Sequence, residues 1–493
     1  MSTPRPIRFV HRGQLVQVET EPTRTLLDWL REDARCTGTK EGCAEGDCGA
    51  CTVMLARADR RAPGGVALHT VNACIQFLPM VDGQAVLSVE DIGVPAALHP
   101  AQQAMVTCHG SQCGFCTPGF VMSLVQVYEQ HLCAGTRPTR QQLADALAGN
   151  LCRCTGYRPI LDAGQRMFDA TAQPLDRAAL KLALDALAQD APLHLEHAGH
   201  RFWAPTTLDE FAALREQHPQ ARLLAGATDI GLWVNKQFRE LDDLLYIGRV
   251  AELQQITEAD GQLQIGAAVP LEQAWAALHR HWPALQAMWL RFASPPVRHA
   301  GTLVGNLANG SPIGDGPPVL MALGAMLLLR RGAVQRRLPL DQFYLGYMHN
   351  ALQPGEFIEA VQVPLPAPGQ HLRAYKVSKR FDSDISALAA GLAIELEGDT
   401  VRAARFAFGG MAAMVKRAEA AENAVLGRRW DEPTAQAAMQ ALAQDFQPIT
   451  DLRASAAYRQ AVAQRLLMRF WLETRPVNPL PAAELDVWHE LRS

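Results

Sequence analysis

The sequence predicts a multidomain protein of the α+β class, and three observations support this prediction. The chain has 493 residues, 48% of them hydrophobic, which is enough for roughly two to four domains with cores of their own. Short segments of alternating polarity, typical of strands, are interspersed with segments of helical spacing. All eleven cysteines lie between Cys36 and Cys154, so the first third of the chain carries a chemistry that the rest lacks.

Charge and hydropathy exclude several classes of protein. The net charge of −4 provides no basic field to attract nucleic acid or anionic lipid. The longest apolar run, near residues 317–330, is shorter than the ~20 residues that a membrane span requires. The N-terminus has no apolar signal core and no twin-arginine pair. We therefore expect a cytoplasmic protein whose cysteines are reduced thiols or metal ligands.

Residues 1–90 are expected to form the first domain. The segment 6–20 alternates like a hairpin, and the segment 25–33 has helical spacing. The segments 66–75 and 84–92 have the pattern of strands. These elements predict a short sheet crossed by one helix.

The same domain contains a closely spaced cysteine group. Cys43, Cys48 and Cys51 follow the spacing C-x4-C-x2-C, and Cys74 comes after them. This is the plant-type ferredoxin spacing for a [2Fe–2S] cluster, in which one short loop delivers three of the four thiolates. The alternative is a zinc site, but zinc sites usually pair two short C-x2-C units. We therefore predict an iron–sulfur cluster in a ferredoxin-like β-grasp domain.

A second cysteine group follows. Cys113 and Cys116 form one pair, and Cys152 and Cys154 form another in the turn-like stretch GNLCRCTGYRP. Cys108 precedes the first pair at a distance that also gives C-x4-C-x2-C spacing, so it is an alternative ligand.

The segments around the second cysteine group have helical spacing. They are residues 99–112, 117–131, 139–150 and 158–172. A bundle of these helices, with cysteines in two of its turns, would bring the two pairs together from opposite sides. We therefore predict a helical domain over residues 91–170 that binds a second cluster through both pairs.

Four motifs of this region resemble those of the xanthine dehydrogenase family of molybdenum hydroxylases. They are GCAEGDCGACTV, VNACI, GSQCGFCTPG and GNLCRCTGYRPI. The resemblance implies one [2Fe–2S] cluster in each of the two domains. The implied ligands are Cys43, Cys48, Cys51 and Cys74 for the first cluster and Cys113, Cys116, Cys152 and Cys154 for the second. The first cluster would face a flavin, and the second would face the molybdopterin of a neighbouring domain, with Gln112 near the pterin.

Some cysteines and histidines are expected to have no ligand role. Residues 171–198 are predicted to form an exposed linker. A metal site is an alternative for the linker histidines, but a solvated linker explains them better: His194, His197 and His200. Three cysteines are expected to be small core residues: Cys36, Cys108 and Cys133.

Two loops rich in glycine and small residues follow, at residues 225–231 and 298–318. A loop of this kind after a strand can offer backbone N–H groups to a phosphate, and two of them could hold one extended dinucleotide. Composition alone explains them equally well as ordinary turns. Neither loop has the GxGxxG or Walker pattern.

The segments LLAGATDIG, TLVGNLANGSPIGD and YKVSKRFDSDIS resemble the FAD domain of the same family, whose fold is shared with vanillyl-alcohol oxidase. The resemblance implies an FAD-binding domain over residues 199–370 and a small α+β domain over 371–493 that closes over the flavin. The sequence departs from the commonest family pattern at Ala227, Asp229 and Val304. Asp229 keeps the acidic character, whereas Ala227 lacks a polar side chain.

The resemblance also assigns flavin contacts residue by residue. One loop would hold the pyrophosphate, and it comprises Leu223, Leu224, Ala225, Gly226, Ala227, Thr228, Asp229 and Ile230. A second loop comprises Thr302, Leu303, Val304, Gly305, Asn306 and Asp315. Phe292 would lie beside the isoalloxazine ring, Ile358 would make an apolar contact, and Lys376 would be a flavin-side lysine.

The resemblance covers nearly the whole chain and implies its function. It implies the small iron–sulfur and FAD subunit of a bacterial two-subunit xanthine dehydrogenase, an oxidoreductase of purine catabolism. Xanthine or hypoxanthine would be hydroxylated on a large molybdopterin-binding partner, in a heterotetramer of two small and two large chains. Electrons would pass through both clusters to FAD and then to NAD, and this chain would contribute no catalytic residue of its own.

Two alternatives stay open. The chain could serve another molybdenum hydroxylase, one that acts on aldehydes or N-heterocycles. It could also be a stand-alone NADH-to-acceptor reductase. The second cluster argues against the reductase, because a simple reductase needs only one ferredoxin-like cluster.

Overall fold

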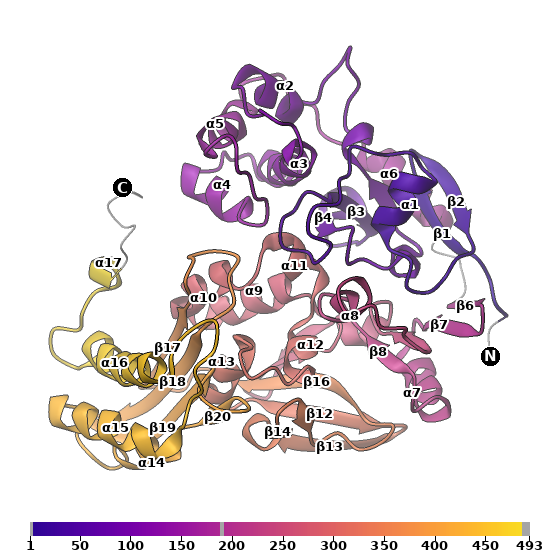
Figure 1. The fold of residues 1–493 in the computed structure, drawn as a ribbon. Helices are drawn as coiled ribbons and strands as arrows, with labels where there is room; N and C mark the ends of the chain where they lie inside the picture. Colours follow the sequence, from indigo (N-terminus) through magenta and orange to yellow (C-terminus); the bar gives the residue numbers. More distant parts are fainter. Residues whose placement is uncertain (1–2, 188–191, 486–493) are drawn as a thin grey trace. The chain divides into compact units, whose positions relative to one another are not determined.

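The computed structural model describes residues 3–187 and 192–485 (Figure 1). The chain forms two compact units. The first comprises the chain up to Ala251 together with Ala293–Gly301, and the second comprises Glu252–Phe292 and the chain from Thr302 onward. Among the described residues, no helix is long and apolar enough to cross a membrane.

The first unit opens with a five-stranded sheet in the order β2-β1-β5-β3-β4. Its strands are β1 (Ile7–His11), β2 (Gln14–Val18), β3 (Thr52–Ala58), β4 (Val66–Asn72) and β5 (Ala85–Leu87). Only β1 and β5 run parallel to each other. The helix α1 (Leu26–Glu32) buries one apolar face in the core of this domain. The strand predicted over residues 84–92 ends with β5, because Ser88 and Asp91 form a capping box that starts a 3₁₀ turn.

The helical domain contains the four predicted helices. They are α2 (Pro100–Thr107), α3 (Thr117–Ala134), α4 (Arg140–Ala146) and α5 (Arg158–Arg166). Their apolar faces share one core. The helices α4 and α5 are shorter than the predicted segments 139–150 and 158–172. The chain between α4 and α5 is therefore free to form the turn that carries Cys152 and Cys154.

The segment 171–198 is not the exposed linker that we expected. The helix α6 (Arg177–Leu187) buries two leucines against the first sheet. The strand β6 (Leu193–His197) pairs with the strand that follows it. Hydrophobic burial along one face of α6 explains this correction, since a helix with such a face is stabilised by docking. Residues 188–191 lie outside the described part of the chain.

A second sheet completes the first unit, in the order β6-β7-β9-β8. Its remaining strands are β7 (His200–Ala204), β8 (Arg222–Leu224) and β9 (Leu244–Tyr246). The helices of this part are α7 (Leu208–Gln217), α8 (Ile230–Asn235) and α11 (Pro295–Ala300). The helix α11 packs along β4, where the ring of His299 lies 3.0 Å from the Thr70 carbonyl oxygen.

The second unit contains two larger antiparallel sheets and a hairpin. The first sheet has the order β10-β11-β16-β12-β13, with β10 (Ile256–Ala259), β11 (Gln262–Gly266), β12 (Met326–Arg331), β13 (Val334–Pro339) and β16 (Phe357–Pro364). The second sheet consists of β17 (Gln370–Val377), β18 (Leu388–Glu397), β19 (Thr400–Gly409) and β20 (Lys416–Arg417). The hairpin is formed by β14 (Tyr344–Gly346) and β15 (His349–Asn350).

The second unit also contains helices. They are α9 (Leu271–His281), α10 (Gln286–Arg291), α12 (Leu303–Ala308), α13 (Gly316–Ala322), α14 (Glu419–Asn423), α15 (Glu432–Asp445), α16 (Ala456–Thr474) and α17 (Ala482–Leu485). The helix α13 packs on β18 and β19, while α15 and α16 share a core with the same sheet. Each face of that sheet is therefore supported by helices.

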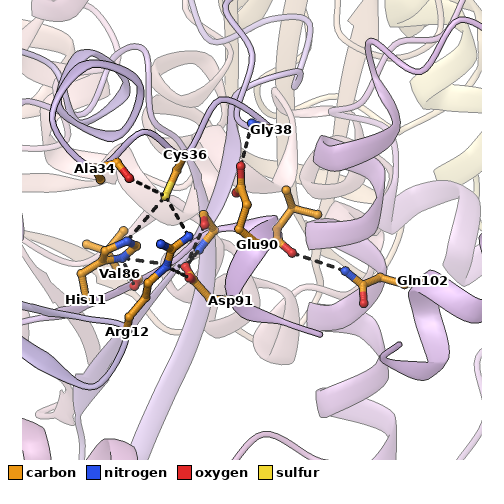
Figure 2. A network of polar contacts seen from close by, with 11 residues as sticks. His11, Arg12, Ala34, Cys36, Gly38, Val86, Glu90, Asp91 and Gln102 are labelled. Atoms are coloured by element: carbon orange, nitrogen blue, oxygen red, sulfur yellow. Dashed lines mark hydrogen bonds and ion pairs between the residues drawn. The ribbon is translucent and has the colours of Figure 1, made fainter. Parts of the chain in front are cut away.

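A polar network ties the segments around the first cysteine loop together (Figure 2). Arg12, between β1 and β2, donates to Asp91 at 2.8 Å and to the Cys36 sulfur at 3.4 Å. Glu90 accepts the Gly38 N–H at 2.7 Å. A glutamine of α2 extends the network to the helical domain. These contacts fix the chain that leads into the cysteine loop.

Candidate functional site

The thiols of the first cysteine group lie together. The sulfur of Cys43 lies next to the thiols of Cys48 and Cys74, and Cys74 lies next to Cys51. Cys51 and Cys74 are buried, whereas Cys43 and Cys48 are partly exposed. The structure thus gathers the cysteines that the sequence spacing grouped, and their role as iron ligands stays a prediction.

Crowding of these thiols separates their pKa values. The Cys48 thiol donates to the Cys43 sulfur, which lowers the pKa of Cys43 and raises the pKa of Cys48. Contacts with Cys43 and Cys51 raise the pKa of Cys74. One thiolate therefore disfavours ionisation of its neighbours. Four thiolates at this place need positive charge among them, which bound iron would supply.

The loop around the first group is held from outside through its carbonyl groups. The Gly46 carbonyl accepts from Asn72 at 2.7 Å. The Cys48 carbonyl accepts from the Leu151 N–H at 3.0 Å, next to Cys152 of the second group. Gly49 has a positive φ of 69°, and a Cβ atom there would lie 2.1 Å from a carbonyl oxygen of the helical domain. Only glycine fits this turn, so the loop sequence is adapted to the contact between the two domains.

Asn150 is the side chain that joins the two cysteine loops. Its amide donates to the Gly49 carbonyl at 3.1 Å and to the Thr52 hydroxyl at 3.2 Å. The hydroxyl of Ser123, on α3, donates to Asn150 Oδ1 at 2.6 Å. Sequence reasoning missed Asn150, although it lies only two positions before Cys152. Nothing in the sequence shows which distant carbonyls a buried amide will reach.

The second cysteine group is also assembled, and it lies nearer the surface. The thiols of Cys113 and Cys154 contact each other, as do those of Cys116 and Cys152. Burial, together with contact to Cys152, raises the pKa of Cys116 to about 12. Cys113 and Cys154 are exposed, whereas Cys152 is buried. Tyr157 fixes the turn, because its hydroxyl accepts the Cys152 N–H at 2.9 Å.

The three remaining cysteines differ in their surroundings. Cys36 is fully buried, as expected for a core residue. Cys108 ends α2 and packs, partly buried, against the helical core. Cys133 is exposed, so the expectation of a buried side chain is wrong there. It lies in the last turn of α3, which reaches solvent beyond the bundle.

Within the described ranges, no three His, Cys, Asp or Glu side chains surround a point suited to one metal ion. The ligands of a binuclear cluster are shared between two irons, so they need not surround a single point. Two groups of four neighbouring thiols have the donor chemistry that such clusters require.

The predicted pyrophosphate loop, residues 223–230, lies in the first unit between β8 and α8. Gly226 packs so closely that a Cβ atom there would lie 2.0 Å from the Ala300 carbonyl oxygen. Ala227 is buried and has a positive φ of 58°, a conformation that larger or branched side chains disfavour. Gly226 and Ala227 are thus two positions of this loop that favour small residues.

The other predicted flavin residues lie in the second unit. Thr302 caps α12 by accepting an N–H of that helix at 3.0 Å. The buried Oδ1 of Asn306, on the same helix, has no hydrogen-bond partner among the described residues. Phe292 is buried with its ring centroid 5.5 Å from that of Trp275, and Ile358 is buried in β16. The unpartnered Oδ1 of Asn306 could accept a hydrogen bond from a ligand that carries a donor group.

Lys376 belongs to a buried polar group with Asp315 and Ser386. Its ammonium pairs with the Asp315 carboxylate and lies 3.1 Å from the Ser386 hydroxyl, which donates to the same carboxylate. Arg291 donates to the Lys376 carbonyl at 2.8 Å. A buried ion pair is retained only where its hydrogen bonds are complete. Sequence reasoning missed Ser386. The sequence shows there only a small polar residue before an apolar strand, a pattern that indicates no particular role.

Four family models match the chain in succession. Residues 9–77 match the 2Fe-2S iron-sulfur cluster binding domain, and residues 88–165 match the [2Fe-2S] binding domain. Residues 196–366 match the FAD binding domain in molybdopterin dehydrogenase. Residues 373–474 match the CO dehydrogenase flavoprotein C-terminal domain.

Curated relatives resemble nearly the whole chain. Xanthine dehydrogenase of Emericella nidulans is 32% identical over 97% of this chain, and xanthine dehydrogenase/oxidase of Rattus norvegicus is 30% identical over 99% of it. The chain spans 39% and 40% of the length of these two relatives.

Solved structures resemble about half of the chain. A chain of carbon monoxide dehydrogenase from Hydrogenophaga pseudoflava, which lacks the Mo-pyranopterin moiety, is 30% identical with a TM-score of 0.52. The likeness covers 54% of this chain and 94% of that one. A chain of quinoline 2-oxidoreductase from Pseudomonas putida 86, 24% identical with a TM-score of 0.51, shares the fold.

Proposed function

Because the chain belongs to the molybdenum hydroxylase family and carries its two iron–sulfur domains and its FAD-binding domain, we propose that it is the electron-transfer subunit of a xanthine dehydrogenase. A molybdopterin-binding partner hydroxylates xanthine or hypoxanthine, and this chain takes up the electrons. The likeness to xanthine dehydrogenases along nearly the whole chain supports the choice of substrate. We place the complex, two copies of each subunit, in the cytoplasm.

The chain's own residues hold and insulate the redox groups. When bound, the clusters carry single electrons, and the flavin collects them and releases a hydride to NAD. Cys43, Cys48, Cys51 and Cys74 would bind the first cluster, and Cys113, Cys116, Cys152 and Cys154 the second. In the first unit, Gly226 and Ala227 would admit the pyrophosphate. In the second unit, Asn306 would present an acceptor to the flavin, and Lys376, paired with Asp315, would be the flavin-side lysine.

The observation that carries this proposal is the surface around the second cysteine group. Cys113 and Cys154 are exposed, and they lie beside two aromatic side chains, Phe115 and Tyr157, that are 46% and 37% exposed. Tyr157 also fixes the turn through its hydroxyl, and exposed aromatic surface next to exposed sulfur is typical of an interface. This surface suits a partner that brings a pterin close to the second cluster, near Gln112.

Co-purification with the partner subunit tests the proposal. The wild-type chain, expressed in its native host, should bring down a large subunit that contains molybdopterin. Phe115→Ser should abolish this co-purification, because Phe115 lies in the proposed interface, while iron content stays unchanged. Leu182→Ser is the matched control, since Leu182 is 75% exposed on α6. Undiminished recovery of the partner with Phe115→Ser would contradict the proposal.

The main alternative within the family is a hydroxylase for aldehydes or N-heterocycles. The likeness to carbon monoxide dehydrogenase, 30% identical, supports a substrate other than xanthine. A substrate screen on the same purified complex separates the two, because only xanthine dehydrogenase reduces NAD with xanthine. A stand-alone reductase would bring down no molybdopterin subunit at all.

A further inference from the structure

The helix that follows the predicted pyrophosphate loop is joined to the first cysteine loop through one side chain. Asn235, the last residue of α8, donates from Nδ2 to the Cys74 carbonyl at 2.6 Å and to the Ala44 carbonyl at 3.2 Å. Both carbonyls lie in the segments that carry predicted cluster ligands. One amide group thus holds both segments of the cysteine site.

The peptide group between Ala44 and Glu45 connects this contact to a ligand sulfur. Its carbonyl accepts from Asn235, and its N–H, on Glu45, faces the Cys43 sulfur. The Cys48 N–H faces the same sulfur at 3.4 Å. Hydrogen bonds in a chain polarise one another, so a donor on the carbonyl strengthens the N–H donor on the other side of the peptide.

The conformation of Ala44 requires such support. Its φ is +55°, in the left-handed region that residues other than glycine adopt at a cost. This conformation turns the Glu45 N–H toward the sulfur. The close packing of α8 adds to the support, because a Cβ atom at Gly231 would lie 3.1 Å from the Ile75 side chain, next to Cys74.

We propose that Asn235 is a positioning residue that sets the reduction potential of the first cluster from the flavin-binding part of the chain. It does so by holding the Ala44–Glu45 peptide with its N–H toward Cys43. The inference rests on the proposed function, since it assumes a cluster on the first cysteine group. Donors to cluster sulfurs stabilise the reduced, more negative form, so Asn235 raises the potential.

The test is a redox titration of the full chain followed by electron paramagnetic resonance, with Asn235→Leu and Asn235→Ala. Leucine has a similar size and no donor, so the midpoint potential of the first cluster should fall while that of the second stays unchanged. Alanine should lower it less, because water can enter and donate to the two carbonyls. Gln237→Ala is the matched control, since it removes an exposed amide two positions further on.

Three outcomes would overturn the inference. They are an unchanged first-cluster potential in Asn235→Leu, an equal shift of both clusters, and loss of the first cluster in both variants. The last outcome would make Asn235 a residue for assembly instead of tuning. Failure of the proposed function is seen separately, because it shows in the wild-type chain, as absence of a molybdopterin partner or of the cluster signals, before any variant is compared.

Discussion

At the scale of the residue, the cysteines could be predicted and their neighbours could not. The spacing of Cys43, Cys48 and Cys51 is a property of one short segment, so the sequence displays it directly. Asn150 and Asn235 act on carbonyls that lie about 100 and 190 positions away in the chain. Such contacts depend on how whole domains pack, and no local pattern records them.

Gly226 gives a prediction at the same scale. Gly226→Val should abolish FAD binding, because a side chain at this position collides with the Ala300 carbonyl and displaces the loop. Flavin is measured by absorbance after release from the purified protein. The signal of the second cluster should persist, since its cysteines belong to the helical domain, whose core does not include this loop.

Gly199→Val is the control for the Gly226 variant. Gly199 lies in the turn between β6 and β7, where nothing occupies the space around a Cβ atom, although its φ is +87°. This variant carries the backbone strain of a non-glycine residue without a collision. Full FAD occupancy in Gly226→Val would show that the pyrophosphate binds elsewhere.

At the scale of the element, the helices were predictable as segments but not in their ends or their docking. The helix α6 lies in a stretch that composition assigned to a linker, and its docking face is only two leucines wide. The strand β5 ends early because Ser88 and Asp91 form a capping box. The alternating pattern that predicts strands does not take such side-chain caps into account. Helical spacing did give the order of the bundle correctly.

The start of α2 gives a pH-dependent prediction. His99 caps this helix, its Nδ1 accepting the Ala101 N–H at 3.1 Å, and burial lowers the pKa of His99 to about 4. In the folded chain, His99 is therefore neutral at pH values above about 4. In the unfolded chain His99 has a pKa of about 6.5, so the unfolded state binds the proton first and stability falls as pH drops from about 6.5 to 4.

Hydrogen exchange of α2 measures this effect. Between pH 7 and pH 5, the opening free energy of α2 should fall by about 2 kcal/mol. His99→Asn keeps a capping acceptor without a titrating group, and it should remove most of this decrease. An equal decrease in the variant would assign the pH dependence to other residues.

At the scale of the whole molecule, the order of domains was predictable and their division into units was not. The family models follow one another in the predicted order. The predicted FAD domain, residues 199–370, is nevertheless shared between the two units: residues 199–251 and 293–301 belong to the first, and residues 252–292 and 302–370 belong to the second. A chain that crosses between units in this way leaves no compositional signal at the crossing.

The central claim is that the chain holds two clusters on two separate cysteine quartets, and electron paramagnetic resonance of the reduced chain tests it most directly. The wild-type protein should show two distinct [2Fe–2S] signals, with four irons and one FAD per chain. Cys154→Ser should remove one signal, whereas Cys108→Ser should leave both, because the thiol contacts of the second group join Cys113 with Cys154 and Cys116 with Cys152. A single signal in the wild-type chain, or a signal lost in Cys108→Ser and retained in Cys154→Ser, would contradict the account.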